Sequence, residues 1–149
     1  YRSLAVQHGK QAAEKTDGDS DAISELANAW GSFMPDWCVR NHHLLIEWFT
    51  DFCSNHPGNR CTIMWLLDNL IDDRRLAEAQ EWLGKLAGID HTFRVPMYRY
   101  MIAQAAGEAE EAETILCEIE NMQDQDLKYM VMNMKHIMDY NIIIYLQKK

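Results

Sequence analysis

The last 25 residues of the chain constrain its fold more than any other segment. From Gln125 to Lys149 there is no Gly or Pro, and on a helix of about 100° per residue the apolar side chains fall on two separate sides. One apolar stripe contains Leu127, Met130, Val131, Met134, Ile137, Met138 and Tyr145, and the other contains Tyr129, Met132, His136, Tyr140 and Ile143. Only Lys128, Lys135 and Asp139 line up as a charged seam. Because a helix that is apolar on all sides is buried on all sides, we expect residues 125–147 to form a long capping helix with two covered faces.

We expect one face of this predicted helix to pack on its own domain, so the second apolar face must be buried by something else. We predict that the second stripe contacts a partner helix or a second copy of the chain. The residues expected to make this contact are Tyr129, Met132, Tyr140 and Ile143. The alternative is that segment 2–15, or another hairpin of the same chain, folds back over the stripe.

The composition favours an all-α fold. The chain has 149 residues and is 48% apolar, but its 7 Gly and 3 Pro are too few for the many tight turns of an all-β protein. This length suits one domain over 1–149, with an N-terminal helix and linker over 1–18. Because the first residue is Tyr1 and not Met, we expect the chain to be a fragment of a longer protein.

Apolar periodicity and turn residues divide the chain into eight predicted helices. They cover 2–15, 21–33, 36–54, 60–71, 74–87, 96–106, 109–121 and 125–147. The His-Pro-Gly-Asn sequence at 56–59 is a strong turn signal, and Gly107 separates two helices. Asp72 or Asp73 is the expected N-cap of the helix over 74–87.

Two of these helices repeat each other at an offset of 33 residues. Segment 76–83 aligns with segment 109–116. The identical pairs are Glu78/Glu111, Ala79/Ala112 and Leu83/Leu116. An alanine four residues before a large apolar residue lets the second helix of a hairpin approach the first closely.

This pattern resembles the tetratricopeptide repeat, a helical hairpin of about 34 residues. The resemblance covers 60–124: Ala79 and Ala112 match the family's small residue in the second helix, and Gly107 falls in its inter-helix turn. It implies antiparallel hairpins stacked into a right-handed superhelix. The pentatricopeptide family has a similar layout but binds RNA, which does not suit an acidic chain.

A superhelix of this kind exposes a concave surface lined by the first helix of each hairpin, and such a groove binds a protein or a peptide. The contact residues that this register predicts are Trp65, Asp68, Asn69, Arg99, Tyr100 and Gln104. Each of them could instead be a packing or solvent residue.

The charge distribution excludes one class of partner. The net charge is −9, and no Lys or Arg occurs between Arg99 and Lys128. Because binding to phosphate backbones needs clustered cations, we expect no nucleic acid partner. The acids of this stretch are Glu108, Glu110, Glu111, Glu113, Glu118, Glu120, Asp124 and Asp126. They form either the solvated face of one helix or a docking surface for a basic partner.

Nothing in the sequence predicts a reactive or metal-binding site. Cys38, Cys53, Cys61 and Cys117 lie within apolar helical patterns, without the paired C-x2-C spacing of structural zinc, and suit reduced thiols of a cytoplasmic protein. There is no glycine-rich phosphate loop and no nucleophile elbow. No apolar run reaches the roughly 18 residues of a membrane span. We therefore expect no metal, no cofactor, no membrane partner and no catalysis.

These patterns best suit a protein–protein interaction scaffold or regulatory domain. An alternative is a homo-oligomerisation domain, in which the helix over 125–147 pairs with its own copy to form a homodimer. A third possibility, from another class, is an enzyme or a metal-binding helical protein.

Overall fold

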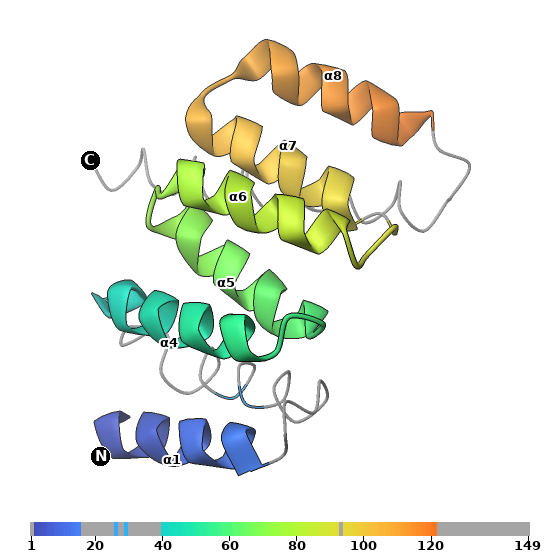
Figure 1. Cartoon of the computed structure of the whole chain (residues 1–149). Coiled ribbons are helices and arrows are strands. Elements are labelled where there is room, and N and C mark those ends of the chain that lie inside the picture. Colours follow the sequence, from blue (N-terminus) through green and yellow to red (C-terminus); the bar gives the residue numbers. More distant parts are fainter. Residues whose placement is uncertain (1, 16–25, 27–28, 30–39, 93, 122–149) are drawn as a thin grey trace. The chain divides into compact units, whose positions relative to one another are not determined.

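The computed structural model describes residues 2–15, 26, 29, 40–92 and 94–121 (Figure 1). These residues contain six α-helices and no strand, which confirms the all-α prediction. Within them, no helix is long and apolar enough to cross a membrane. The predicted helix over 125–147 lies outside the described residues, as does most of the helix predicted over 21–33.

The chain divides into two compact units, Tyr1–His91 and Thr92–Lys149. The first unit contains α1 (Arg2–Lys15), α4 (His42–Asn55), α5 (Arg60–Asp72) and α6 (Leu76–Ala87), and the second contains α7 (Arg94–Ala106) and α8 (Ala109–Glu120). In the first unit, α5 packs against both α4 and α6, and in the second unit α7 packs against α8. Sequence-adjacent helices are therefore packing partners in each unit. The single domain expected over 1–149 stays a prediction.

Local sequence signals set the start of α5 and of α7. The side chain of Asn59, in the predicted turn, caps α5: its Oδ1 accepts hydrogen bonds from the backbone N and the Oγ1 of Thr62, both at 3.1 Å. Pro96 lies in the first turn of α7, where a helix needs no backbone N–H donor. The start of α5 therefore lies where the sequence predicts it, whereas α7 begins at Arg94, two residues before the predicted start.

The capping predicted for α6 is wrong. α5 extends to Asp72, and Asp73 is its C-cap, so neither carboxylate is free to begin the next helix. The N-cap of α6 is Arg75, whose side chain makes no capping hydrogen bond. Its guanidinium instead pairs with Glu78 in the first turn, with Nε 2.8 Å from Oε1 and Nη2 2.8 Å from Oε2.

The 33-residue offset predicted from the sequence holds for whole helices. α6 and α8 have 12 residues each, and they begin 33 positions apart, at Leu76 and Ala109. Their buried residues correspond one for one: Ala79, Trp82, Leu83 and Leu86 in α6, and Ala112, Ile115, Leu116 and Ile119 in α8. α5 and α7 have 13 residues each. The pairs α5–α6 and α7–α8 are therefore similar helical hairpins, which correspond most closely in their second helices (Figure 1).

The turn inside each hairpin is built in the same way. Arg74 and Gly107 occupy equivalent positions, and both have left-handed backbone, with φ of 61° and 74°. The equivalent hydrogen bonds run from Arg75 N to Leu70 O at 2.9 Å and from Glu108 N to Ala103 O at 3.0 Å. A left-handed residue that closes a helix in this way is usually Gly, because a Cβ is strained in that conformation.

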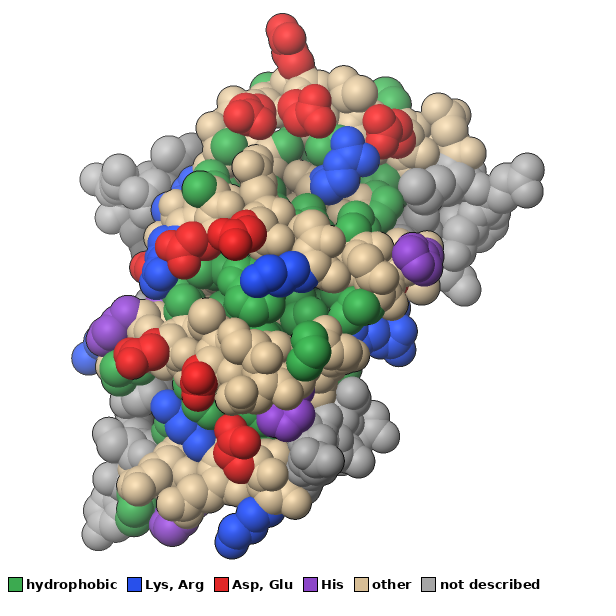
Figure 2. Space-filling model, in the orientation of Figure 1, with side chains coloured by type: hydrophobic (Ala, Val, Ile, Leu, Met, Phe, Trp, Pro, Cys, Tyr) green, Lys and Arg blue, Asp and Glu red, His purple; other side chains and the backbone are tan. Residues whose placement is uncertain are grey.

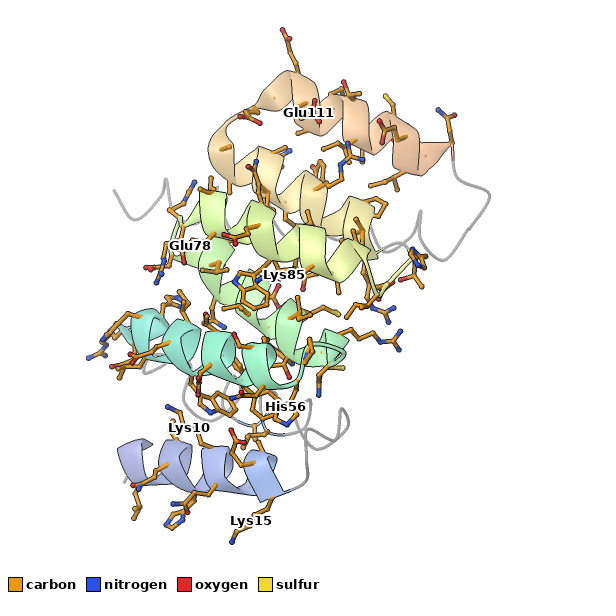
Figure 3. All side chains as sticks on the ribbon, viewed as in Figure 1. Lys10, Lys15, His56, Glu78, Lys85 and Glu111 are labelled. Carbon is orange, nitrogen blue, oxygen red and sulfur yellow. The ribbon has the colours of Figure 1, made fainter. Side chains whose placement is uncertain are left out.

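An aromatic cluster lies on the side of α4 that α1 covers. The ring centre of Trp48 is 4.9 Å from that of Phe49 and 5.6 Å from that of Phe52. Ala13 of α1 packs against Phe52. Lys10 extends from α1 toward α4 and places its Nζ 5.6 Å from the centre of the Trp48 ring (Figure 3). Trp30 and Trp37, which we expect from the apolar pattern of the sequence to belong to the same cluster, lie outside the described residues.

Candidate interaction surfaces

The predicted contact residues of α5 lie in two different environments. Trp65 and Asp68 are partly exposed, whereas Asn69 is only 8% exposed. The amide nitrogen of Asn69 donates to the Trp65 carbonyl oxygen at 2.8 Å. Its Oδ1 therefore faces His42 and accepts a hydrogen bond from the Nδ1 of that ring at 2.9 Å. Asn69 links α4 to α5 and presents little surface to a partner, while Trp65 and Asp68 remain accessible.

The predicted contact residues of α7 are used mainly to hold α8. Tyr100 is 2% exposed and belongs to the core between the two helices, and its hydroxyl accepts a hydrogen bond from Gln104 Nε2 at 2.9 Å. The guanidinium of Arg99 pairs with two carboxylates of α8, at 3.2 Å from Glu118 Oε2 and 3.7 Å from Glu111 Oε1. Of the three predicted residues, Gln104 is the one that is well exposed.

The repeat shows that the predicted residues of the two first helices do not occupy equivalent positions. At an offset of 33, Trp65 corresponds to Tyr98 and Asp68 to Met101. The partly exposed residues that share this helix face are Cys61, Met64, Trp65 and Asp68 in α5, and Arg94, Met97, Met101 and Ala105 in α7. Sequence reasoning missed Met97 and Met101. The 33-residue offset, which repeats Met64 as Met97, was the signal that could have found them.

The acidic stretch forms the outer face of α8. Figure 2 shows acidic side chains gathered over this helix, on the side opposite its buried apolar residues. The same face borders a shallow, open hollow lined by Ala109, Glu110, Glu113, Thr114, Cys117, Glu118 and Asn121. Glu111 and Glu118 are paired with Arg99, so part of this charge is compensated within the hairpin. A docking role for the remaining carboxylates stays a prediction.

Burial raises the pKa of two groups in the first unit, Cys53 and Asp72. Cys53 is 1% exposed, and burial raises the pKa of its thiol to about 12, although Lys85 acts in the opposite direction. A thiol with this pKa stays protonated near neutral pH and is a poor nucleophile. Loss of hydration raises the pKa of Asp72, and the charge of His42 opposes this shift. In the described part of the chain, no group of three or more His, Cys, Asp or Glu side chains could hold a metal ion.

An exposed cation covers an aromatic ring on α6. Lys85 lies on the outside of this helix (Figure 3), and its Nζ is 3.8 Å from the centre of the Trp82 ring, which is 8% exposed. At this distance the ammonium group is attracted by the face of the ring. The contact shields an apolar surface that would otherwise face solvent.

The predicted contacts of the C-terminal segment, Tyr129, Met132, Tyr140 and Ile143, lie outside the described residues. The residues that the structure describes form α-helices only, and they contain two similar helical hairpins, α5–α6 and α7–α8. No family model, no curated protein and no solved structure matches the chain. The resemblance to tetratricopeptide repeats accordingly stays a prediction.

Proposed function

We propose that this chain is a protein-interaction scaffold of tetratricopeptide-like type. In this proposal, its hairpins continue a right-handed superhelix, and a protein or peptide partner binds the exposed face of the first helices. The observation that supports it is the repetition of a helical hairpin, with equivalent buried positions in α6 and α8 and an equivalent turn. Arrays of such hairpins use their repeated surfaces for binding. A cytoplasmic location, expected from the cysteines, also stays a prediction.

The side chains on the repeated face suit this role. Trp65 is partly exposed, and tryptophan is among the residues that most often dominate the energy of an interface. Met64, Met97 and Met101 are partly exposed on the same face of their helices. Because methionine is unbranched and polarizable, it adapts to partners of different shape. We therefore expect Trp65 to anchor a partner and the neighbouring Met64 to adapt to the shape of that partner.

The test is a selection of random linear peptides on the immobilised chain, followed by affinity measurement with labelled peptides. Selected peptides should bind Trp65→Ala at least about tenfold more weakly than the wild type, the loss expected for a central aromatic contact. The matched control is Leu44→Ala on α4, which truncates an apolar residue that is 41% exposed and should leave the affinity unchanged.

Two further measurements make the result decisive. Trp65→Phe retains an aromatic ring and should bind with intermediate affinity, and far-UV circular dichroism reports whether each variant is folded. Peptides that bind wild type and Trp65→Ala equally would show that this face is not the binding surface. Light scattering on the same samples reports self-association, the property that the homo-oligomerisation alternative requires.

A further inference from the structure

An apolar stripe runs along the side of α4 that α1 covers. This α4 stripe consists of Leu44, Trp48 and Phe52, which are spaced four residues apart and therefore lie on one side of the helix. The exposure of these residues decreases along the helix: Leu44 is 41% exposed, Trp48 is partly exposed and Phe52 is buried. The α4 stripe is therefore only partly covered.

Comparison with α6 and α8 shows that hairpin packing does not require the α4 stripe. At an offset of 33 residues, the three helices share buried positions, which hold Ile46, Ala79 and Ala112, then Phe49, Trp82 and Ile115, and then Cys53, Leu86 and Ile119. The positions of the α4 stripe hold Ala77, Glu81 and Lys85 in α6, and Glu110, Thr114 and Glu118 in α8, and all of these residues are exposed. The α4 stripe is therefore an addition to the common pattern, and it serves a different contact.

α1 covers the α4 stripe mainly with small side chains. Of the α1 residues whose side chains the structure describes, the buried ones are Val6, Gly9 and Ala13. Ala13 packs against Phe52. Lys10 reaches Trp48 with its Nζ 5.6 Å from the ring centre (Figure 3), close to the limit of about 6 Å for a cation–π contact. Leu4, a large apolar residue of α1, is 52% exposed and does not add to the cover.

Two properties of α1 favour its local opening. It has 14 residues with Gly9 in its interior, and an isolated helix of this length is marginal even without a glycine. The described helix pairs that pack extensively are α4–α5, α5–α6 and α7–α8, and α1 is not among them. Elements with few apolar contacts open with a lower free energy than the rest of a fold. Because α4 also packs against α5, it stays held when α1 leaves.

We propose that α1 is a displaceable cover and that the α4 stripe binds an amphipathic helix of a partner protein. This surface is separate from the Trp65 face of the scaffold function, so the two proposals can fail independently. The contact with α1 shows what chemistry fits the α4 stripe, namely a helix that places a cation over Trp48. The exposed Asp51, three residues after Trp48 on the same side of α4, favours a cation there as well.

The partner helix differs from α1 in its apolar residues. It carries large ones, spaced three and four residues apart, where α1 has Gly9 and Ala13, and it retains a Lys or Arg for Trp48. Such a helix buries more apolar surface on the α4 stripe than α1 does. It can therefore displace α1, although α1 has the advantage of being part of the same chain.

Hydrogen exchange of the full chain tests whether α1 opens by itself. We expect the amides of α1 to exchange at least about tenfold faster than those of α4 under native conditions. Equal protection of the two helices would show that α1 is an integral part of the core, and the proposal would be wrong.

Variants of α1 in the full chain test what the α4 stripe binds. Ala13→Asp places a carboxylate against Phe52 and should undock α1, whereas Ala12→Asp, at an exposed position, should leave it docked. The probes are helix-forming peptides selected from a randomised library on Ala13→Asp. They should bind this variant at least about tenfold more tightly than the wild type or Ala12→Asp, because α1 no longer competes. Adding Trp48→Ala to Ala13→Asp should weaken binding by about tenfold or more.

Urea unfolding followed by circular dichroism shows whether Ala13→Asp acts locally. The variant should lose the signal of α1 and keep the urea midpoint of the remaining helices. A lowered midpoint for those helices would mean that α1 stabilises the whole unit, which overturns the proposal. Failure to select any peptide, or equal binding of the peptides to wild type and Ala13→Asp, overturns it too. Peptides that depend on Trp65 and not on Trp48 overturn it while leaving the scaffold function standing.

Discussion

Replacement of Gly107 by alanine tests the turn that the two hairpins share. Gly107 has φ of 74°, and a Cβ added there would meet no atom within 4 Å, so the only penalty is the strain of the left-handed backbone. That strain costs an L-residue about 1–2 kcal/mol. Alanine also restricts the unfolded chain, which offsets about 0.4–1 kcal/mol. We therefore expect Gly107→Ala to lower the free energy of unfolding by about 1 kcal/mol.

Two variants in the first unit should change stability in the opposite direction. Gly84 lies inside α6, is exposed, and has open space around an added Cβ, so Gly84→Ala should stabilise the helix by about 0.5–1 kcal/mol. Arg74 occupies the turn position equivalent to Gly107, with φ of 61°. Arg74→Gly relieves this strain, although it also loses the contacts of the Arg74 side chain, and we expect a stabilisation below about 1 kcal/mol.

Urea unfolding monitored by two signals checks these values. All 5 Trp residues precede Thr92, so tryptophan fluorescence reports on the first unit, whereas circular dichroism reports on the helices of both. At an unchanged slope, a shift of the midpoint measures the change in stability. The reasoning is refuted if Gly107→Ala is as stable as the wild type, or if Gly84→Ala and Gly107→Ala change stability in the same direction.

Two further predictions follow from buried positions. Ala112 is 2% exposed in the core between α7 and α8, so Ala112→Leu should overpack it and cost about 1–3 kcal/mol in urea unfolding, whereas Ala109→Leu at an exposed position should cost little. Burial raises the pKa of Cys53 from its ordinary value of 9.0 to about 12. The stability that the neutral Cys53 thiol contributes is therefore fully present below pH 9.0 and is lost as the pH rises toward about 12. At about pH 10.5 the loss should approach 2 kcal/mol relative to pH 8, and Cys53→Ala should remove this component; equal pH dependence of the two proteins would contradict the assignment.

The helices and their repetition were predictable because the signals for them are local. The Asn59 cap, the turn at Gly107 and the periodic apolar residues act within one or two turns of helix, so they can be read from consecutive residues. The α6 cap was mispredicted for a related reason. From the sequence alone, Asp72 could be the last residue of one helix or the N-cap of the next. It is the last residue of α5 because α5 extends that far.

The contact residues of α7 were less predictable because periodicity does not say which neighbour covers a helix face. Tyr100 and Arg99 are both plausible surface residues in a sequence. In the structure Tyr100 fills the core beneath α8, and Arg99 reaches Glu118, which lies 19 residues further along the chain. The surface positions of α7, Met97 and Met101, became apparent only when the offset between the two hairpins was applied to exposed residues.

The sequence by itself determined that the described part of this chain is helical, and that the pattern of α6 recurs in α8 at an offset of 33 residues. Only the tertiary structure decided which polar groups are buried. Asn69 joins His42 across 27 residues, and nothing local marks Asp90, which follows α6, as a carboxylate that is 0% exposed and lies 3.9 Å from Arg60. The physical reason is that helix formation depends on neighbours in sequence, whereas burial and partner choice depend on which helices meet in space.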